Sequence, residues 1–371
     1  MKKICILQND LAFGGTDTFV LNLCQGLICD NYDVTVVLSI DKQKIALRES
    51  ELTDLGVNIV KTSSLQGGLK SKLKHLVLLY KELKKGKYDV FQTNIDLFNG
   101  PQMFIAWLAK IPVRVCHSHN SQQGRELREG RTFSVKLYQG IMRWLCWQFS
   151  NRRCGCSKAA LDFLFGDKWK KDPKARVIHN GIDLSEYSKK FDFEEKKREL
   201  GLTNTYNIST VGRISFQKNP EFLLEIFYEL SKIRGDVDLV WCGKGELESV
   251  VKKQINDFKL DNRVHLLGTR NDIPEILCCS DVFLLPSRFE GLGIVLVEAQ
   301  AAKLPCIMSD VIPKEVDCGL CLSLSLEQSA EHWAKQISNI LDGNCNLDID
   351  REKIDEYSIE HMIKEMEEVF E

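Results

Sequence analysis

The chain has 371 residues, of which 44% are hydrophobic and 27% are charged; this composition is typical of globular proteins, excludes disorder and fits two domains of roughly 150 to 200 residues each. Its 50 basic and 52 acidic residues leave a net charge of −2, which excludes a globally basic nucleic-acid binder, so we expect no nucleic-acid partner. No apolar run reaches the roughly 18 residues of a membrane span, and the apolar start at Ile4–Leu7 is too short for a signal peptide, so a cytoplasmic location is expected.

A predicted strand at Lys3–Leu7 leads into a glycine pair and then into a helix with apolar residues at helical spacing. Gly14 and Gly15 permit a tight loop that a ligand can approach, and Thr16 or Asp17 is expected to cap the helix. The loop lacks the G-x-G-x-x-G pattern, so it does not indicate a dinucleotide site. A purely structural turn is the alternative to a ligand-binding loop.

Strands and helices then alternate through the first half of the chain. The predicted strands lie at 33–39, 57–60, 88–93, 113–117 and 153–157. The predicted helices lie at 42–55, 69–85, 98–109 and 131–150. Such alternation is typical of a parallel sheet covered by helices on both faces, so the predicted fold class is α/β.

Two of the seven histidines stand at the end of the predicted strand at 113–117. Because side chains alternate along a strand, His117 and His119 are predicted to share one face, at the carboxyl edge of the sheet where ligands bind. A hydrogen-bonded structural role is the alternative for either histidine. A metal site is not expected, because the sequence offers no third ligand nearby.

The stretch 125–153 is both basic and aromatic. Its basic residues are Arg125, Arg128, Arg131, Lys136, Arg143, Arg152 and Arg153, and its aromatic residues include Phe133, Tyr138, Trp144, Trp147 and Phe149. A helix with a basic and an aromatic face suits an anionic membrane surface, which would place the protein peripherally on the inner face of the cell membrane. Core packing of the aromatic side chains is the alternative, and both interpretations stay open.

The domain boundary is predicted near 181–200. A last strand and turn at 176–183 precede a strongly charged segment, and a new series of strands begins at Tyr206. We therefore expect one domain at 1–185 and a second at 186–355.

A cationic loop follows the first strand of the second domain, Asn207–Val211. Arg213 and Lys218 lie in this loop, just before a helix predicted at 220–233 with Asn219 as its cap. Two cations beside a glycine are typical of a phosphate clamp, in which Arg grips the oxygens as a fork and Lys acts as a point charge. A solvated surface loop is the alternative.

The next two predicted strands also end in glycine-containing loops. The strand at 237–242 runs into Gly243, and the strand at 263–267 runs into the loop 268–272, after which Ile273 starts a short helix. Glycine lets the backbone of such loops come close to a ligand.

The stretch 282–310 is predicted to form a strand, a glycine-containing turn, a helix and a further strand, which together make one right-handed crossover of a parallel sheet. Glu290 lies in the turn beside Gly291 and Gly293, and Glu298 lies in an early turn of the helix. A favourable interaction with the helix dipole is the alternative for Glu290. It does not explain Glu298, whose neighbours are almost all apolar, so ligand hydroxyls are the expected partners of that carboxylate.

These loops together complement a nucleotide-sugar. Cations suit a diphosphate, and carboxylates suit the hydroxyls of a ribose and a sugar. No metal and no cofactor is needed to build such a pocket. The fourteen cysteines lack the paired spacing of a zinc site and are interpreted as buried, reduced thiols.

The spacing of Glu290 and Glu298 within F-E-G-x-G-x-x-x-x-E-A resembles the donor-site motif of retaining glycosyltransferases of family four, which have the GT-B fold. Further matching motifs span nearly the whole chain, namely Gly14-Gly15, HSHN around His119, His179–Asp183, Gly212-Arg213 with Lys218-Asn219, and Gly243–Gly245. The chain is most similar to family members of bacterial capsule or exopolysaccharide assembly. The resemblance implies two facing Rossmann-like domains with a cleft between them, and a last helix, 356–371, that packs back on the first domain.

The resemblance also implies roles for residues. Arg213 and Lys218 would hold the donor diphosphate and stabilise the departing nucleoside diphosphate. Glu298 would bind the ribose, Glu290 the donor sugar, and His119 or His117 would contact that sugar near the reacting carbon. The other residues that the resemblance places against the substrate are Gly14, Gly15, Asn180, Gly243, Arg270, Ile273, Gly291, Leu292 and Gly293.

By the same resemblance the chain is expected to be an enzyme that transfers a hexose or N-acetylhexosamine, with retention, from a UDP-sugar to a glycan or lipid-linked saccharide. Asp17, Leu292 and Lys303 depart from the family pattern, which puts acceptor and sugar preference in question more than the reaction class. The alternatives are a non-catalytic sugar-nucleotide-binding partner subunit and a nucleotide-sugar epimerase on the same scaffold. An oxidoreductase is disfavoured by the missing glycine fingerprint.

Overall fold

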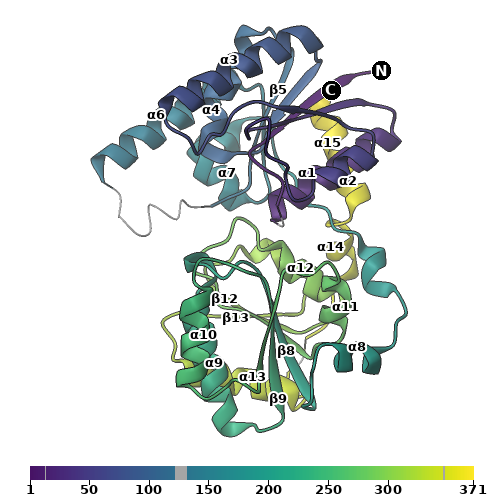
Figure 1. Cartoon of the computed structure of the whole chain (residues 1–371), viewed down its shortest axis with the longest axis vertical. Helices are drawn as coiled ribbons and strands as arrows, with labels where there is room; N and C mark the ends of the chain where they lie inside the picture. The colour runs from purple at the N-terminus through teal and green to yellow at the C-terminus, as the bar shows by residue number, and fades with distance from the viewer. Residues whose placement is uncertain (13, 122–131, 346) are drawn as a thin grey trace. The chain divides into compact units, whose positions relative to one another are not determined.

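The computed structural model describes residues 1–12, 14–121, 132–345 and 347–371, and divides them into two compact units. Unit 1 comprises residues 1–182 together with 356–371, and unit 2 comprises 183–355. Each unit is a parallel sheet flanked by helices (Figure 1), which confirms the predicted α/β class.

Unit 1 contains a seven-stranded sheet in the order β3-β2-β1-β4-β5-β6-β7, with every neighbouring pair parallel. Its strands are β1 (Lys3–Gln8), β2 (Asp33–Leu38), β3 (Asn58–Lys61), β4 (Val90–Thr93), β5 (Val113–Ser118), β6 (Arg152–Gly155) and β7 (Ala175–Val177). Its helices are α1 (Gly15–Cys29), α2 (Glu49–Asp54), α3 (Leu69–Gly86), η1 (Asp96–Phe98), α4 (Asn99–Leu108), α6 (Phe133–Phe149), α7 (Lys158–Phe165), η2 (Gly166–Lys171) and α15 (Ile359–Phe370).

Alternation along the central strands supplies both hydrophobic cores of unit 1. On β1, Ile4 and Ile6 pack with α1, α2 and α15 on one face, whereas Cys5 and Leu7 pack with α3, α4 and α7 on the other. The last helix of the chain therefore belongs to the core of unit 1. Its contact with α1 is close, since a Cβ at Gly26 would lie 2.4 Å from Ile363.

Two local predictions for unit 1 were wrong. The helix expected at 42–55 forms only over Glu49–Asp54, because the residues before it are mostly exposed and offer no apolar face to bury. At α1, neither Thr16 nor Asp17 is the cap residue. Gly14 takes that position with an extended backbone, and the carboxylate of Asp17 accepts a hydrogen bond from the Gly14 N–H at 3.2 Å.

Unit 2 contains a six-stranded parallel sheet in the order β10-β9-β8-β11-β12-β13. Its strands are β8 (Tyr206–Val211), β9 (Val237–Cys242), β10 (Val264–Gly268), β11 (Val282–Leu285), β12 (Cys306–Ser309) and β13 (Cys321–Leu324). Its helices are η3 (Leu184–Ser188), α8 (Phe193–Glu199), η4 (Phe216–Lys218), α9 (Pro220–Ile233), α10 (Glu248–Asp257), α11 (Ile273–Cys278), α12 (Ile294–Ala301), η5 (Lys314–Val316), α13 (Ala330–Leu341) and α14 (Arg351–Asp355).

The helices of unit 2 cover both faces of its sheet. Large apolar side chains such as Phe227 and Trp333 fill the core under α9, α10 and α13, and a smaller cluster around Leu200 and Ile276 lies under α8 and α11. Asn219 stands before α9 as predicted, but it has a left-handed backbone and its side chain forms no cap hydrogen bond. Within the described ranges, no helix is both long and apolar enough to cross a bilayer.

Candidate functional site

The carboxyl edge of the unit 2 sheet brings two of the predicted site residues into direct contact. Because β8 and β11 are neighbours in the sheet, the loop after β8 and the turn after β11 lie beside each other. The Lys218 Nζ lies 2.7 Å from Oε1 of Glu290, and both side chains are largely buried. A buried cation and a buried anion are thus paired at the edge where ligands bind in such sheets.

Two further side chains hold the Glu290 carboxylate in place. Ser287 donates its hydroxyl to Oε1 at 2.7 Å, and Gln217 donates its amide to Oε2 at 3.1 Å. Ser287 is itself positioned from β12, since the hydroxyl of Ser309 donates to its carbonyl at 2.6 Å. Neither Ser287 nor Gln217 was predicted as a site residue; their positions next to Glu290 and Lys218 were the available sequence signal.

Glu298 lies on α12, half-buried among apolar neighbours. In the described part of the chain its carboxylate has no hydrogen bond or ion pair. Burial raises its pKa to about 7, and the nearby charge of Lys218 acts in the opposite direction. Lys218 therefore lies near both predicted carboxylates, and Glu298 has the unsatisfied hydrogen-bonding capacity that a ligand hydroxyl could fill.

Tyr187 on η3 is a second neighbour of Glu298 that the sequence reasoning missed. Burial raises the pKa of its phenol well above the ordinary value, and the carboxylate of Glu298 adds to this. Nothing in the charged segment around Tyr187 marked it as a site residue, because its position depends on η3 packing against α12.

Glycines permit close backbone approach at the ends of β8, β9 and β10. At Gly243, where φ is +145°, a Cβ would lie 2.1 Å from the carbonyl oxygen of Gly212. The Gly243 N–H donates to the Gly268 carbonyl at 2.7 Å, and the Gly212 N–H donates to Cys242 at 2.9 Å. A side chain at Gly243 would disrupt these backbone hydrogen bonds between neighbouring loops.

The turn before α12 is similarly constrained. Gly293 has a φ of +88° and precedes the helix as its cap residue, a left-handed conformation that favours glycine. Gly291 and Leu292 are buried. All three stand beside Glu290 in the turn, as predicted from the sequence.

Arg213 does not join the Lys218–Glu290 pair. Its side chain is 75% exposed, and its Nε lies 3.4 Å from Oε2 of Glu246 on the following glycine loop. The structure thus places Arg213 in the predicted loop but directs its guanidinium to an exposed partner.

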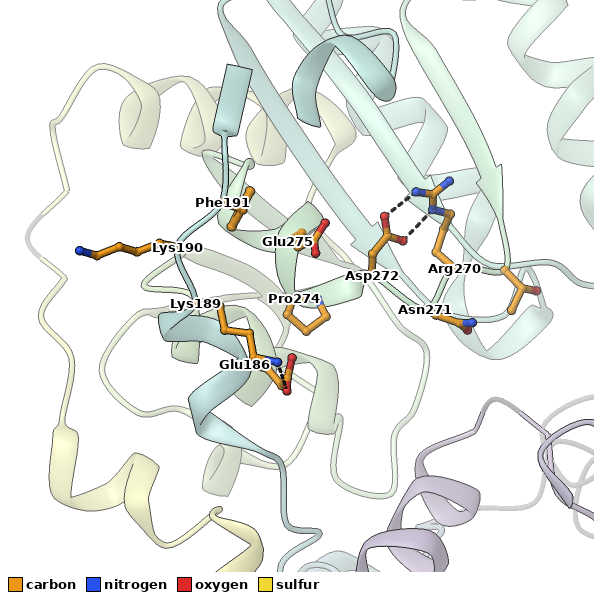
Figure 2. A pocket seen from close by; sticks show the side chains of 10 residues that line it. Glu186, Lys189, Lys190, Phe191, Arg270, Asn271, Asp272, Pro274 and Glu275 are labelled. Atoms are coloured by element: carbon orange, nitrogen blue, oxygen red, sulfur yellow. Dashed lines mark hydrogen bonds and ion pairs between the residues drawn. The ribbon is translucent and has the colours of Figure 1, made fainter. Parts of the chain in front are cut away.

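Arg270 is engaged in an ion-pair network beside a pocket of about 530 Å³. Figure 2 shows its guanidinium turned onto Asp272, and a second contact reaches Glu199 at 2.8 Å. The pocket is lined by Glu186, residues 189–191, residues 269–272, Pro274 and Glu275. Ile273 is half-buried against the cluster around Leu200.

Lys196 extends this network and was not predicted. Its ammonium contacts Glu199, Asp272 and Glu275, with N···O distances of 3.0, 2.5 and 2.8 Å. The same contacts tie α8 to the start of α11, so Lys196 supports the pocket wall.

In unit 1, His117 and His119 lie on one face as predicted. Their rings stack with centroids 4.2 Å apart, and Phe19 packs edge-on against His117 at 4.8 Å. Both are buried. Burial lowers the pKa of His119 to about 3, with the Asn180 side chain opposing this, and lowers the pKa of His117 well below its ordinary value. Both imidazoles are therefore neutral at physiological pH.

Hydrogen bonding distinguishes the two histidines. His119 Nε2 lies 3.2 Å from Oδ1 of Asn94. Neither ring nitrogen of His117 has a hydrogen-bond partner within the residues that the structure describes. The side chain of Asn180, which is also buried, interacts with His119, so three of the predicted residues gather at this edge.

Asp96, which was not predicted as a site residue, positions the loop after β5. Its carboxylate accepts the backbone N–H of His119 at 2.8 Å and that of Asn120 at 3.2 Å. Burial raises its pKa, and these hydrogen bonds act in the opposite direction. The signal was an acidic residue three positions after β4, the strand beside β5.

The glycine loop after β1 is exposed at Gly14 and Gly15. Asp17, in the first turn of α1, accepts a hydrogen bond from Gln8 at 2.7 Å, and burial raises its pKa to about 6. Within the described ranges, no group of three His, Cys, Asp or Glu side chains could hold a metal ion.

The stretch 125–153 lies only partly within the described residues. Arg125, Arg128 and Arg131 fall outside them. The remainder is mainly α6, on which Phe133 and Trp144 are exposed while Trp147 packs under the guanidinium of Arg153 at 4.1 Å. Core packing therefore accounts for some of its aromatic residues and not for others.

Two protein-family models match the chain. The model described as Glycosyltransferase Family 4 matches residues 13–186, and the model described as Glycosyl transferases group 1 matches residues 192–361.

Curated relatives match over most of the chain. EpsF of Bacillus subtilis (strain 168), which is named as a glycosyltransferase, is 30% identical over 342 residues, covering 91% of this chain and 87% of EpsF. The Escherichia coli UDP-Gal:alpha-D-GlcNAc-diphosphoundecaprenol alpha-1,3-galactosyltransferase is 35% identical over 251 residues, covering 64% of this chain and 62% of that enzyme. CapH of Staphylococcus aureus, named as a capsular polysaccharide biosynthesis glycosyltransferase, is 24% identical and covers 78% of this chain and 79% of its own.

Solved structures share the fold. Anabaena HepE in complex with UDP and glucose matches with a TM-score of 0.82 at 18% identity, over 99% of both chains. The lipopolysaccharide glycosyltransferase WaaG matches with a TM-score of 0.71 at 14% identity, over 98% of this chain and 95% of its own. At these identities the likeness concerns the fold alone.

Proposed function

The chain belongs to the family-four glycosyltransferases, and from this membership we propose that it moves a sugar, with retention of configuration, from a UDP-sugar to a saccharide acceptor in surface polysaccharide biosynthesis. The observation that carries the proposal is the position of Lys218. This residue pairs with Glu290 at 2.7 Å and lies near Glu298, at the carboxyl edge of a nucleotide-binding type of sheet.

Lys218 and Arg213 act on the donor diphosphate. Lys218 is largely buried and fixed, so its charge is available without reorganisation when negative charge develops on the leaving group. Arg213 is exposed and bound only to an exposed carboxylate, so its long side chain can turn from Glu246 to a phosphate oxygen at small cost.

The two carboxylates bind hydroxyls. Glu298 has open acceptor positions in a half-buried setting, which suits the ribose. Glu290 is held in a fixed orientation by Ser287, Gln217 and Lys218, which suits a carboxylate that orients the donor sugar. Each hydrogen bond from a hydroxyl to a carboxylate contributes on the order of 1.5–3 kcal/mol.

Stabilisation of the leaving group is the central catalytic task of the proposed mechanism. The acceptor hydroxyl attacks the anomeric carbon from the face that the phosphate leaves, the glycosidic bond to phosphate breaks, and the departing phosphate takes the hydroxyl proton. No ionised protein base is then required. The neutral imidazole of His119, with Asn94 on its Nε2, is the unit 1 group assigned to the donor sugar, and the backbone of Gly14 and Gly15 is assigned to the diphosphate.

UDP is the proposed nucleotide because structural neighbours were solved with it, HepE among them. The pocket beside Arg270 is the place proposed for the base. A lipid-linked saccharide is the proposed acceptor, since the E. coli relative is named for a diphosphoundecaprenol-linked one. Contact of the 125–153 stretch with an anionic membrane surface is part of the same proposal.

A donor screen tests the proposal. Purified protein is incubated with UDP- and GDP-sugars, with and without saccharide acceptors, and release of the nucleoside diphosphate is measured. Acceptor-dependent UDP release with an α-linked product from an α-linked donor is expected. Tight binding without release would instead favour a partner subunit, and interconversion of donor sugars without release would favour an epimerase. Glu290→Gln should lower the acceptor-dependent UDP release, because it removes the carboxylate proposed to bind the sugar, and Glu331→Gln, on the exposed face of α13, is its matched control.

A further inference from the structure

We propose that α3, α4 and α6 form one membrane-docking surface, which lies flat on a leaflet rich in anionic lipid. The surface extends beyond the 125–153 stretch, because α3 contributes a second apolar stripe and seven lysines lie on or next to it, while α4 contributes the exposed Trp107.

The outer face of α6 is apolar where a surface helix is normally polar. Phe133, Leu137, Ile141 and Trp144 recur at helical spacing and are all exposed, with 82% of Phe133 and 58% of Trp144 accessible. The opposite face is already buried, through residues such as Val135 and Cys146. The exposed stripe is therefore not the side that α6 uses for packing within unit 1.

α3 presents a second stripe with the same spacing. Leu69, Leu73, Val77 and Tyr80 are exposed, with 74% of Leu69 and 55% of Val77 accessible. The buried face of α3 is again a different one, made by His75, Leu79 and Leu83. Two helices of one unit thus expose apolar stripes that no other described element covers.

α4 packs against both of these helices and so joins their apolar stripes into one surface. α3, α4 and α6 are seen on the same side of unit 1 in Figure 1. The ring of Phe98, just before α4, lies 5.2 Å from the ammonium of Lys72 and 6.4 Å from the ring of Tyr138.

An aromatic group joins the other ends of α4 and α6. Phe149 contacts both Trp107 and Trp144, with ring centroids 5.3 and 6.1 Å apart, and both tryptophans are exposed. Tryptophan is favoured at the membrane–water interface because its ring has an apolar body and a polar edge.

The charge around the surface selects an anionic leaflet as the occupant. Residues 69–87 contain seven lysines and one acidic residue, Glu82, whose carboxylate accepts the hydroxyl of Tyr88 at 2.8 Å. Residues 132–150 contain Lys136 and Arg143 and no acidic residue. Basic residues beside an apolar stripe strengthen adsorption to anionic lipid.

The same charge disfavours a second copy of the chain. Two copies that met through this face would bring two lysine-rich helices together, and like charges across an interface are destabilising. A bilayer accepts the apolar stripes between its headgroups and pairs the lysines with phosphates. The helices would lie in the plane of the interface.

Vesicle flotation of the full chain tests this inference, and because no donor or acceptor is present the result is independent of the proposed reaction. Phosphatidylcholine vesicles are compared with vesicles that also contain phosphatidylglycerol. We expect binding only to the second kind, and weaker binding as salt is raised. Absence of binding to phosphatidylglycerol vesicles would overturn the proposal.

Paired substitutions locate the surface. Leu137→Ser with Ile141→Ser on α6, and Leu73→Ser with Val77→Ser on α3, should each weaken binding about tenfold. The control is Ile233→Ser with Val250→Ser, which removes exposed apolar residues from unit 2 and should leave binding unchanged. Thermal unfolding verifies that each variant is folded.

Two results would contradict the proposal. Equal binding by the α3 pair and the unchanged chain would remove α3 from the surface. A dimer in light scattering that the α6 pair converts to a monomer would show that a second copy, and not a membrane, covers this face.

Discussion

The ammonium of Lys218 lies 2.7 Å from the carboxylate of Glu290, although the two residues are 72 positions apart in the chain. The contact exists because β8 and β11 are adjacent in the sheet. In the proposed reaction Lys218 binds the diphosphate and Glu290 binds the sugar. The donor therefore interacts with two side chains that already form an ion pair with each other. The site is then preorganised, since both charges are fixed before the donor arrives.

Lys218→Ala and Arg213→Ala should each lower turnover by on the order of 10²–10³, equivalent to about 3–4 kcal/mol, because each removes charge stabilisation of the leaving group. The measurement is steady-state release of UDP with the donor found by screening. Near-normal turnover in both variants would show that the diphosphate is held elsewhere.

The same two variants should differ in stability. Lys218→Ala leaves the buried Glu290 carboxylate without its cation, and such removal of one partner costs about 3–5 kcal/mol when no other group compensates; Ser287 and Gln217 should reduce this cost. Arg213→Ala removes only an exposed pair and should change the unfolding free energy by less than about 1 kcal/mol. Equal urea unfolding midpoints would contradict the buried pairing.

Glu298 should make unit 2 less stable as the pH rises from 4.5 to 7. Burial raises the pKa of this carboxyl from 4.5 to about 7, so in this range the folded state binds the proton that the unfolded state releases. Glu298→Gln removes this dependence. The variant should gain on the order of 2–3 kcal/mol relative to the unchanged chain between pH 4.5 and pH 8, measured by urea unfolding. Glu331→Gln is the exposed control. If the stability of Glu298→Gln changed with pH in parallel with that of the unchanged chain, the raised pKa of Glu298 would be disproved.

The buried histidines should act in the opposite direction in unit 1. The pKa of His119 is lowered to about 3, so the folded state stays neutral while the unfolded state takes up a proton below pH 6.5. Stability should therefore fall by about 1.4 kcal/mol per pH unit for this histidine as the pH drops below 6. His119→Asn should reduce the slope between pH 7 and pH 5, whereas the exposed His361→Asn should not.

Gly243→Ala should destabilise unit 2 by at least about 2 kcal/mol, because φ is +145° and the new Cβ would lie 2.1 Å from the Gly212 carbonyl oxygen. UDP affinity, measured by calorimetry, should fall with it. Gly235→Ala is the matched control, since a Cβ there meets nothing within 4 Å, and its effect should stay within about 0.5 kcal/mol.

The fold was predictable from local pattern, because apolar runs and turn residues recur at the spacing of strands and helices. The helix predicted at 220–233 agrees with α9, and the glycines at strand ends marked the loops at the sheet edge. The prediction was wrong where pattern and burial disagree, as in the helix expected at 42–55.

Side-chain pairing was less accessible to sequence reasoning. The sequence predicted that Lys218 and Glu290 lie at strand ends. That their side chains form an ion pair depends on β8 and β11 being neighbours in the sheet, which the sequence does not specify. It gave no means to see that Arg213 turns to Glu246, or that Asp96 holds the loop of His119. These contacts join residues that are distant in the sequence or depend on rotamer choice.

The position of α15 has a consequence for how the protein is made. Met362, Ile363 and Met366 fill the same core as Ile4 and Ile6, so unit 1 lacks part of its interior until the whole of unit 2 has been translated. A nascent chain stalled before Met362 would present that unfinished interior to chaperones and proteases.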